Sequence, residues 1–105
     1  YKPNVDDMRE SPSLVIMSAL KAAGAKVDYH DPHVEEIKIT RSHPHLAGER
    51  SSLFSAETVS HYDVVVILTD HKAVDYQLLA EHARLIVDTR NAMRGKKVIG
   101  KLVKA

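Results

Sequence analysis

The hydrophobic pattern divides the chain into helix-like and strand-like segments. Between Leu14 and Ala23, apolar residues recur at steps of three and four, at Ile16, Ala19, Leu20 and Ala23, which is the period of a helix with one buried face. Ser11 and Pro12 suit the N-cap and the first helical position, and Gly24 suits a left-handed stop. The pattern therefore predicts a helix from Ser11–Pro12 to Gly24.

Two segments with strand-like alternation follow this helix. Lys26–His30 alternates apolar and polar residues before the break at Asp31–Pro32, which predicts a strand. Glu35–Arg41 alternates again, which indicates a short edge strand or an extended arm. Residues 42–52 show no period and are predicted to form a loop.

The second half of the chain alternates helices with strands. Val64–Leu68 is a continuous, mostly β-branched run, typical of a strand buried on both faces of a parallel sheet. Leu85–Val87 is a further buried strand, and Val98–Gly100 is a candidate for a last one. Helices are predicted over Ser55–His61 and Asp75–His82. This alternation predicts an α/β fold with an open, mostly parallel, Rossmann-like sheet flanked by helices.

Composition limits the classes of protein to which the chain can belong. Its 105 residues are 44% hydrophobic and 28% charged, as in a single globular domain over residues 1–105. A net charge of +1 argues against bulk electrostatic binding of nucleic acid or of an anionic membrane. The chain has no cysteine, which excludes thiolate chemistry and fits a cytoplasmic location. No signal peptide is visible, and the pattern is already under way at Tyr1, so we expect a piece of a longer protein.

Three polar clusters are expected to meet at one edge of the sheet. They are the opening loop Tyr1–Arg9, Thr69–His71 after one strand, and Asp88–Asn91 after another. Ligands of open α/β sheets bind beyond the carboxyl ends of the strands. The ligand site of this chain is therefore predicted at that edge.

The opening loop carries cations next to a helix start. Lys2 and Arg9 there suit an anion, because a helix N-terminus presents free N–H groups and partial positive charge. The alternative is a solvated loop in which Asp6, Asp7 and Glu10 neutralise both cations. Asp6 and Asp7 are unlike an acid/base pair, since adjacent side chains rarely face one another.

Arg90 stands directly beyond a predicted buried strand. This position favours ligand binding, with Asp88 and Asn91 orienting its guanidinium group. The alternative is a surface arginine that is ion-paired with Asp88.

The seven histidines do not form a recognisable metal motif. His43–His45 and Asp31–His33 are the densest groups, but they lie in predicted loops and lack the spacing of a zinc site. Solvent-exposed histidine is the better interpretation, and we expect no metal. The sequence also lacks a nucleophile elbow and a Gly-rich dinucleotide fingerprint.

The segment Tyr1–Pro12 resembles the start of the C-terminal domain of the UDP-glucose/GDP-mannose dehydrogenase family. That family's pattern is Gly-x-Ala-(Tyr/Phe)-Lys, a short acidic stretch, and Arg-Glu-Ser. Three further landmarks of the family follow in the same order along the chain, at Tyr29–Pro32, Val66–His71 and Val87–Arg90. The resemblance therefore covers nearly the whole chain. The motifs are most similar to those of bacterial enzymes like UDP-N-acetylglucosamine 6-dehydrogenase.

The resemblance implies a UDP-sugar-binding domain of an NAD-dependent 6-dehydrogenase, which oxidises the sugar C6 alcohol to a carboxylate. It implies that Tyr1 and Lys2 contact UDP, that Arg90 reaches the UDP-sugar, and that Arg9 approaches the NAD pyrophosphate. The catalytic cysteine and most of the NAD site would lie in N-terminal and central domains, so this fragment alone should be inactive. The parent would be a homo-oligomer.

Two other classes of function compete with this interpretation. A non-catalytic α/β module for oligomerisation is the main alternative, with the opening loop as a salt-bridged cap. A receiver-like domain fits less well, because it leaves the Arg-Glu-Ser loop unexplained.

The Gly-x-Ala of the family is missing before Tyr1, so the first strand of the sheet is expected to be short or absent.

Overall fold

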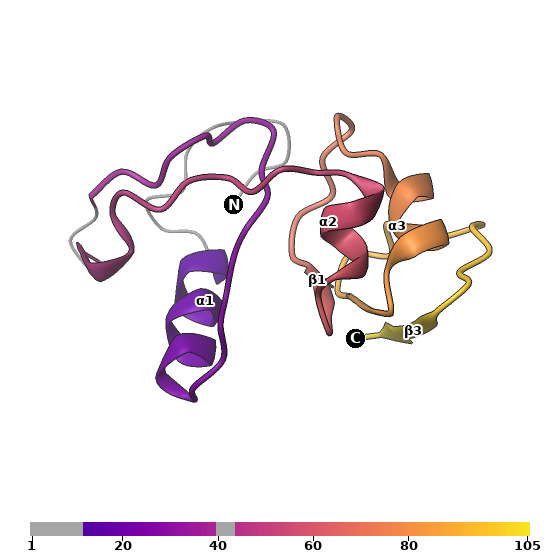
Figure 1. The fold of residues 1–105 in the computed structure, drawn as a ribbon, viewed down its shortest axis with the longest axis horizontal. Helices are drawn as coiled ribbons and strands as arrows, with labels where there is room; N and C mark the ends of the chain where they lie inside the picture. The colour runs from indigo at the N-terminus through magenta and orange to yellow at the C-terminus, as the bar shows by residue number, and fades with distance from the viewer. Residues whose placement is uncertain (1–11, 40–43) are drawn as a thin grey trace. The chain divides into compact units, whose positions relative to one another are not determined.

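A computed structural model of the chain describes residues 12–39 and 44–105. The chain divides into an N-terminal unit, Tyr1–Ser52, and a C-terminal unit, Leu53–Ala105 (Figure 1). The opening loop, with Tyr1, Lys2 and Arg9, lies outside the described residues. No helix within the described ranges is long and apolar enough to cross a membrane.

The N-terminal unit begins with the helix α1, Pro12–Ala22. Gly24 follows in the left-handed conformation, with φ +96°. Its N–H donates to the Lys21 carbonyl (3.0 Å), and the next N–H, from Ala25, donates to the Leu20 carbonyl (3.0 Å). These two bonds form a Schellman motif, so the predicted stop at Gly24 is confirmed. The predicted Ser11 cap lies outside the described residues.

The inner face of α1 packs into a small apolar core. The core joins the helix to the extended segment that follows it, and its buried members are Leu14, Met17, Val34, Ile37 and Leu46. The buried face is not the predicted one: Leu14 and Met17 are buried, whereas Leu20 of the predicted apolar stripe is 39% exposed. This core stabilises the N-terminal unit.

The strand predicted at Lys26–His30 is wrong, because this segment is extended without belonging to a sheet. Alternation alone makes no strand without a neighbour to pair with. Within the described ranges, the backbone of this segment bonds to another segment once, where the Tyr29 carbonyl accepts from the Ser52 N–H (2.7 Å). The next segment is the predicted arm, closed by one antiparallel bridge between Glu36 and Arg50. Within the predicted loop, Pro44–Leu46 forms the 3-10 helix η1.

The C-terminal unit is a parallel three-stranded sheet with two helices. Along the chain it consists of α2 (Ala56–Ser60), β1 (Val65–Ile67), α3 (Tyr76–His82), β2 (Leu85–Asp88) and β3 (Lys101–Lys104). The strand order is β1-β2-β3, and both pairings are parallel. The predicted open parallel α/β sheet is therefore confirmed.

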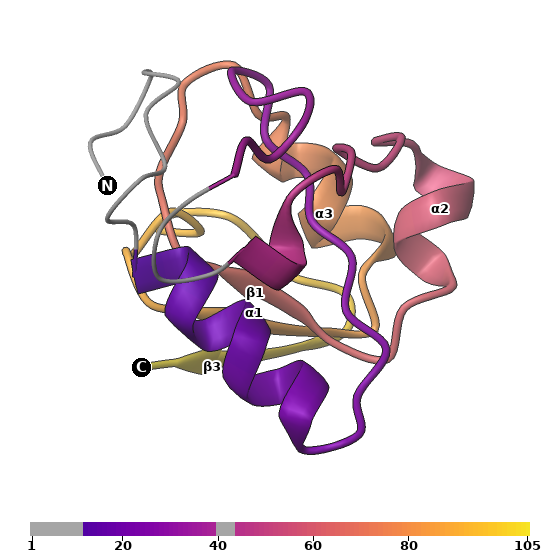
Figure 2. The ribbon, with the colours of Figure 1, turned by 90° about the vertical axis from the view of Figure 1, so that its left-hand side faces the viewer.

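Both helices begin at a capping side chain. The Ser55 hydroxyl accepts from the Thr58 N–H (3.1 Å) before α2, and the Asp75 carboxylate accepts from the N–H groups of Gln77 (3.1 Å) and Leu78 (3.2 Å) before α3. The helices lie side by side (Figure 1 and Figure 2). Their predicted extents agree with the structure to within one residue at each end.

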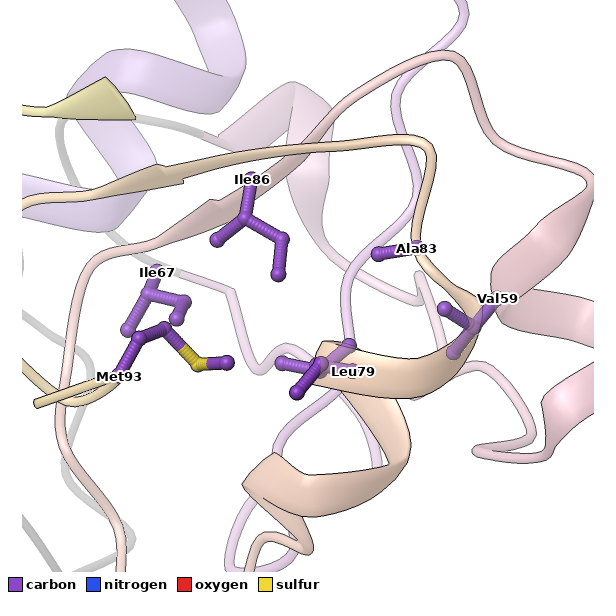
Figure 3. Close-up of a cluster of buried hydrophobic side chains, with 7 residues drawn as sticks. Val59, Ile67, Leu79, Ala83, Ile86 and Met93 are labelled. Carbon is purple, nitrogen blue, oxygen red and sulfur yellow. The ribbon is translucent and has the colours of Figure 1, made fainter. Parts of the chain in front are cut away.

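One face of the sheet packs against these helices. Ile67 of β1 and Ile86 of β2 meet Val59 of α2 and Leu79 of α3, and Met93 closes the cluster from the loop after β2 (Figure 3). Ile86 and Met93 are almost completely buried. The core thus joins β1 and β2 to both helices.

The other face of the sheet is not deeply buried. Val66, Val87 and Val103 are in register across the three strands. Val66 is 39% exposed and Val103 is 49% exposed. Within the described C-terminal unit, the prediction that Val64–Leu68 is buried on both faces is therefore wrong. A β-branched run shows the preference for a strand but does not tell whether one face or both are covered.

The last strand is not Val98–Gly100, as predicted, but Lys101–Lys104. The Ile99 N–H donates to the Ala80 carbonyl (2.9 Å), which ties this segment to the end of α3 instead of to the sheet. Pairing with β2 starts only after Gly100, where Lys101 lies opposite Leu85.

Candidate functional site

The carboxyl ends of β1 and β2 lie next to each other in the C-terminal unit. Ile67 and Asp88, the last residues of the two strands, are partners in register. Beyond them, Thr89 donates to the Ile67 carbonyl through its N–H (3.2 Å) and its hydroxyl (2.6 Å). The structure thus brings together two of the predicted clusters, Thr69–His71 and Asp88–Asn91. The third cluster, Tyr1–Arg9, lies outside the described residues.

Asp88 organises the loop after β2. Its side chain is buried, with 1% exposure. Oδ1 accepts from the backbone N–H groups of Arg90 (3.0 Å) and Ala92 (3.1 Å), and Oδ2 accepts from that of Met93 (2.8 Å). Asn91 lies at the tip of this turn with φ +58°, a left-handed conformation that asparagine tolerates. One carboxylate therefore fixes the path of the chain on both sides of the tip.

These bonds also set the charge state of Asp88. Burial by itself would raise the pKa of this carboxyl, but backbone hydrogen bonds from Met93, Arg90, Ala92 and Asn91 outweigh burial and lower the pKa below its ordinary value. Asp88 is therefore ionised at neutral pH, and its charge is satisfied by the main chain.

The side chain of Arg90 is exposed beyond the end of β2. We expected Asp88 to orient the guanidinium group, and the alternative was an ion pair with Asp88. Both expectations are wrong, because the Asp88 oxygens bond to the main chain, including the Arg90 N–H. Within the described part of the chain, the guanidinium group makes no hydrogen bond or ion pair. Among the described residues, the loop therefore presents a cation without a counter-charge beyond the carboxyl ends of β1 and β2.

The loop after β1 is held by a tyrosine that the sequence did not single out. The Tyr76 hydroxyl accepts from the His71 N–H (2.9 Å) and donates to the Thr69 carbonyl (3.4 Å). Burial and the Asp70 carboxylate raise the pKa of Tyr76, so the phenol stays protonated. Its position in the first turn of a predicted helix was the one available signal, and it did not point to a loop contact.

The predicted histidine groups make local contacts. The Asp31 carboxylate accepts from the His33 N–H (2.7 Å), and His45 Nε2 lies 2.9 Å from the Ser18 hydroxyl. In the described ranges, no cluster of three or more His, Asp or Glu side chains is arranged to hold a metal ion. Arg90 carries a guanidinium group, a side chain that suits a phosphate or a carboxylate.

Comparison with known proteins identifies a family with a similar sequence. The profile of the UDP-glucose/GDP-mannose dehydrogenase family, UDP binding domain, matches residues 1–95. The UDP-glucose 6-dehydrogenase of Rhizobium meliloti is 33% identical over 103 residues, which are 93% of this chain and 23% of that protein. The UDP-N-acetyl-D-mannosamine dehydrogenase of Methanococcus vannielii is 32% identical over 101 residues, or 89% of this chain and 21% of that protein.

A third relative has a higher identity. The UDP-glucose 6-dehydrogenase YwqF of Bacillus subtilis is 37% identical over 101 residues, which are 87% of this chain and 21% of that protein. The chain thus spans between a fifth and a quarter of the length of these relatives. No solved structure matches the chain significantly. The match over residues 1–95 confirms the resemblance: the chain belongs to the UDP-glucose/GDP-mannose dehydrogenase family and corresponds to its UDP binding domain.

Proposed function

We propose that this chain binds the UDP part of a UDP-sugar in an NAD-dependent 6-dehydrogenase, with Arg90 as a ligand of the UDP-sugar. The reaction would convert the C6 alcohol of the sugar to a carboxylate, and we propose a UDP-N-acetylhexosamine as the substrate. The relatives named for UDP-N-acetyl-D-mannosamine support this choice of sugar, whereas others are named for UDP-glucose.

The exposed guanidinium group of Arg90 is the observation that carries this proposal. Its main chain is fixed by Asp88, so the side chain starts from a defined point at the carboxyl edge. A diphosphate offers oxygens that a guanidinium group can bind through two parallel hydrogen bonds. The charge of Arg90 is available for this purpose because no carboxylate in the described part of the chain pairs with it.

The remaining proposed contacts belong to the opening loop. Tyr1 and Lys2 would contact UDP, with Lys2 supplying charge, and Arg9 would approach the pyrophosphate of NAD. The family profile includes this loop, which supports the assignment. NAD supplies the hydride acceptor when it is bound, and most of its site would belong to other parts of the full-length protein.

The other proposed partners follow from the lengths of the relatives. Because the chain spans 23% of the Rhizobium meliloti enzyme, we propose that N-terminal and central domains complete the active site. The sequence contains no cysteine, so a catalytic cysteine would come from those domains, and this chain alone would be inactive. We also propose that the full-length protein is a homo-oligomer.

Arg90→Ala in the full-length protein tests the proposed function. Calorimetric titration with UDP should show affinity weaker by about 10- to 100-fold, the usual loss when a hydrogen bond to a charged group is removed. Arg90→Lys should be intermediate, because lysine keeps the charge but not the planar fork.

Arg84→Ala is the matched control for this experiment. Arg84 is also exposed but precedes β2, at the opposite edge of the sheet, where it lies 3.8 Å from Asp63. Its removal should leave UDP affinity unchanged. Equal UDP affinity for Arg90→Ala and the wild-type protein would contradict the role of Arg90.

A further inference from the structure

We propose that Lys104, at the end of β3, is a second phosphate-binding cation that acts together with Arg90. This inference rests on the proposed function, because it adds a residue to the same UDP site. Lys104 lies beyond residues 1–95, the part of the chain that matches the family profile. The pairing of β2 with β3 identifies it, since the motifs of the sequence do not include it.

The strand register places Lys104 at the ligand edge. β2 and β3 are parallel, and Asp88 lies directly opposite Lys104. The N–H of the next residue, Ala105, donates to the Asp88 carbonyl (3.0 Å), so the pairing continues to the end of β2. Neighbouring strands lie about 4.8 Å apart. Lys104 therefore stands one strand away from the residue that holds the Arg90 loop.

Lys104 also faces the same side of the sheet as this loop. Side chains alternate along a strand, and Leu102, two residues before Lys104, packs against the core cluster that contains Ile86. Asp88, two residues after Ile86, points to this same side and binds the loop through Met93. The lysine and the Arg90 loop thus share both an edge and a face of the sheet.

Within the described part of the chain, no carboxylate pairs with Lys104 at the carboxyl ends of β2 and β3. Asp88 is the register partner of Lys104, but the backbone N–H groups of the loop occupy both oxygens of its carboxylate. Asp70 follows β1, on the other side of β2 from β3, and contributes its charge next to Tyr76. The ammonium group of Lys104 is exposed and makes no ion pair in the described ranges.

Two cations of different kinds suit a nucleoside diphosphate. The guanidinium group of Arg90 can bind one phosphate through its fork, while the ammonium group on the flexible stem of Lys104 can neutralise the second. Lys104 would therefore contribute to the affinity for the phosphates of the ligand and not to the affinity for the nucleoside. This difference separates a binding role from a structural one.

Lys104→Ala and Lys101→Ala in the full-length protein make a matched pair. Both lysines are exposed and belong to β3, but Lys101 lies opposite Leu85, at the amino end of β2. We expect Lys104→Ala to weaken UDP binding by about three- to five-fold, the size of one partly screened charge interaction. Lys101→Ala should have no effect, uridine affinity measured by competition should be unchanged in both variants, and Lys104→Arg should restore UDP binding.

Each outcome decides for or against the role of Lys104. A selective loss of UDP affinity in Lys104→Ala supports it, and the loss should shrink as salt concentration rises. Equal effects of the two alanine variants, or a parallel loss of UDP and uridine affinity in Lys104→Ala, would overturn it. Normal UDP binding by Arg90→Ala would instead refute the proposed function, so the two failures are distinguishable.

Discussion

Asp88→Ala should lower the free energy of unfolding of the C-terminal unit by about 3 kcal/mol and also weaken UDP binding. The substitution leaves the backbone N–H groups of Arg90, Ala92 and Met93 without their acceptor. Each such group costs about 1–3 kcal/mol when it is buried, and the exposed part of the loop recovers some of this through water. Urea unfolding measures the stability, and calorimetry with UDP on the full-length protein measures the binding.

Asp88→Asn separates charge from shape. One amide oxygen can still accept at the position of Oδ1, but the amide nitrogen cannot accept from the Met93 N–H, so the loss of stability should be intermediate.

The pKa of Asp88 is lower in the folded protein than its ordinary value of 3.8. Its contribution to stability is therefore present above that value and lost as pH falls through the folded pKa.

The pH dependence of stability measures this contribution. Between neutral pH and the acid limb, the wild-type protein should lose more stability than Asp88→Asn, which lacks the titrating group. Identical acid limbs for the two proteins would show that the carboxylate has the same pKa in the folded and unfolded chains.

Gly100→Ala should destabilise the C-terminal unit by about 3 kcal/mol through loss of the last strand. A Cβ atom at this position would lie 2.4 Å from the Ala83 carbonyl oxygen and 2.5 Å from that of Arg84. Both atoms belong to the backbone, so neither can move aside as a flexible side chain does. Relief requires breaking the bonds on either side, from Ile99 to Ala80 and from Lys101 to Arg84.

Gly95→Ala is the control for this prediction. Gly95 has φ +76°, which is unfavourable for alanine, but nothing lies within 4 Å of the Cβ position. Its cost should be only about 1 kcal/mol, the conformational part alone. Urea unfolding of the two variants compares them, and amide exchange along β3 should be faster in Gly100→Ala. Equal stability of the two variants would show that the backbone near Gly100 adapts without loss.

Local chemistry made much of the fold predictable. The caps at Ser55 and Asp75 and the stop at Gly24 lie within a few residues of the backbone that they bind, so the sequence pattern could identify them. The strand at Val98–Gly100 was misplaced because the close approach of Gly100 to the α3–β2 junction depends on packing between segments far apart in the chain. The predicted strand at Lys26–His30 was wrong for a similar reason, since pairing partners are not encoded in alternation.

The place of Arg90 beyond the end of a strand was predictable, but the contacts around it were not. The rule that ligands bind beyond parallel strands singled out Arg90. The sequence could not predict that the Asp88 side chain bonds to the backbone of its own loop. These bonds depend on the left-handed conformation of Asn91 and on three backbone donors. The sequence did not single out Lys104, the cation proposed above, because the register of β3 with β2 decides its position and no motif marks that register.

The lysines of β3 have a second consequence, which concerns aggregation. In the sheet of the described residues β3 is a border strand, and one side of its backbone is left without a strand partner. Border strands invite pairing with other chains, and short length and lysine side chains discourage it. β3 has four residues and begins and ends with lysine. A second strand that docked here would have to pack beside the charged side chains of Lys101 and Lys104, so these residues would disfavour such pairing at the border of the described sheet.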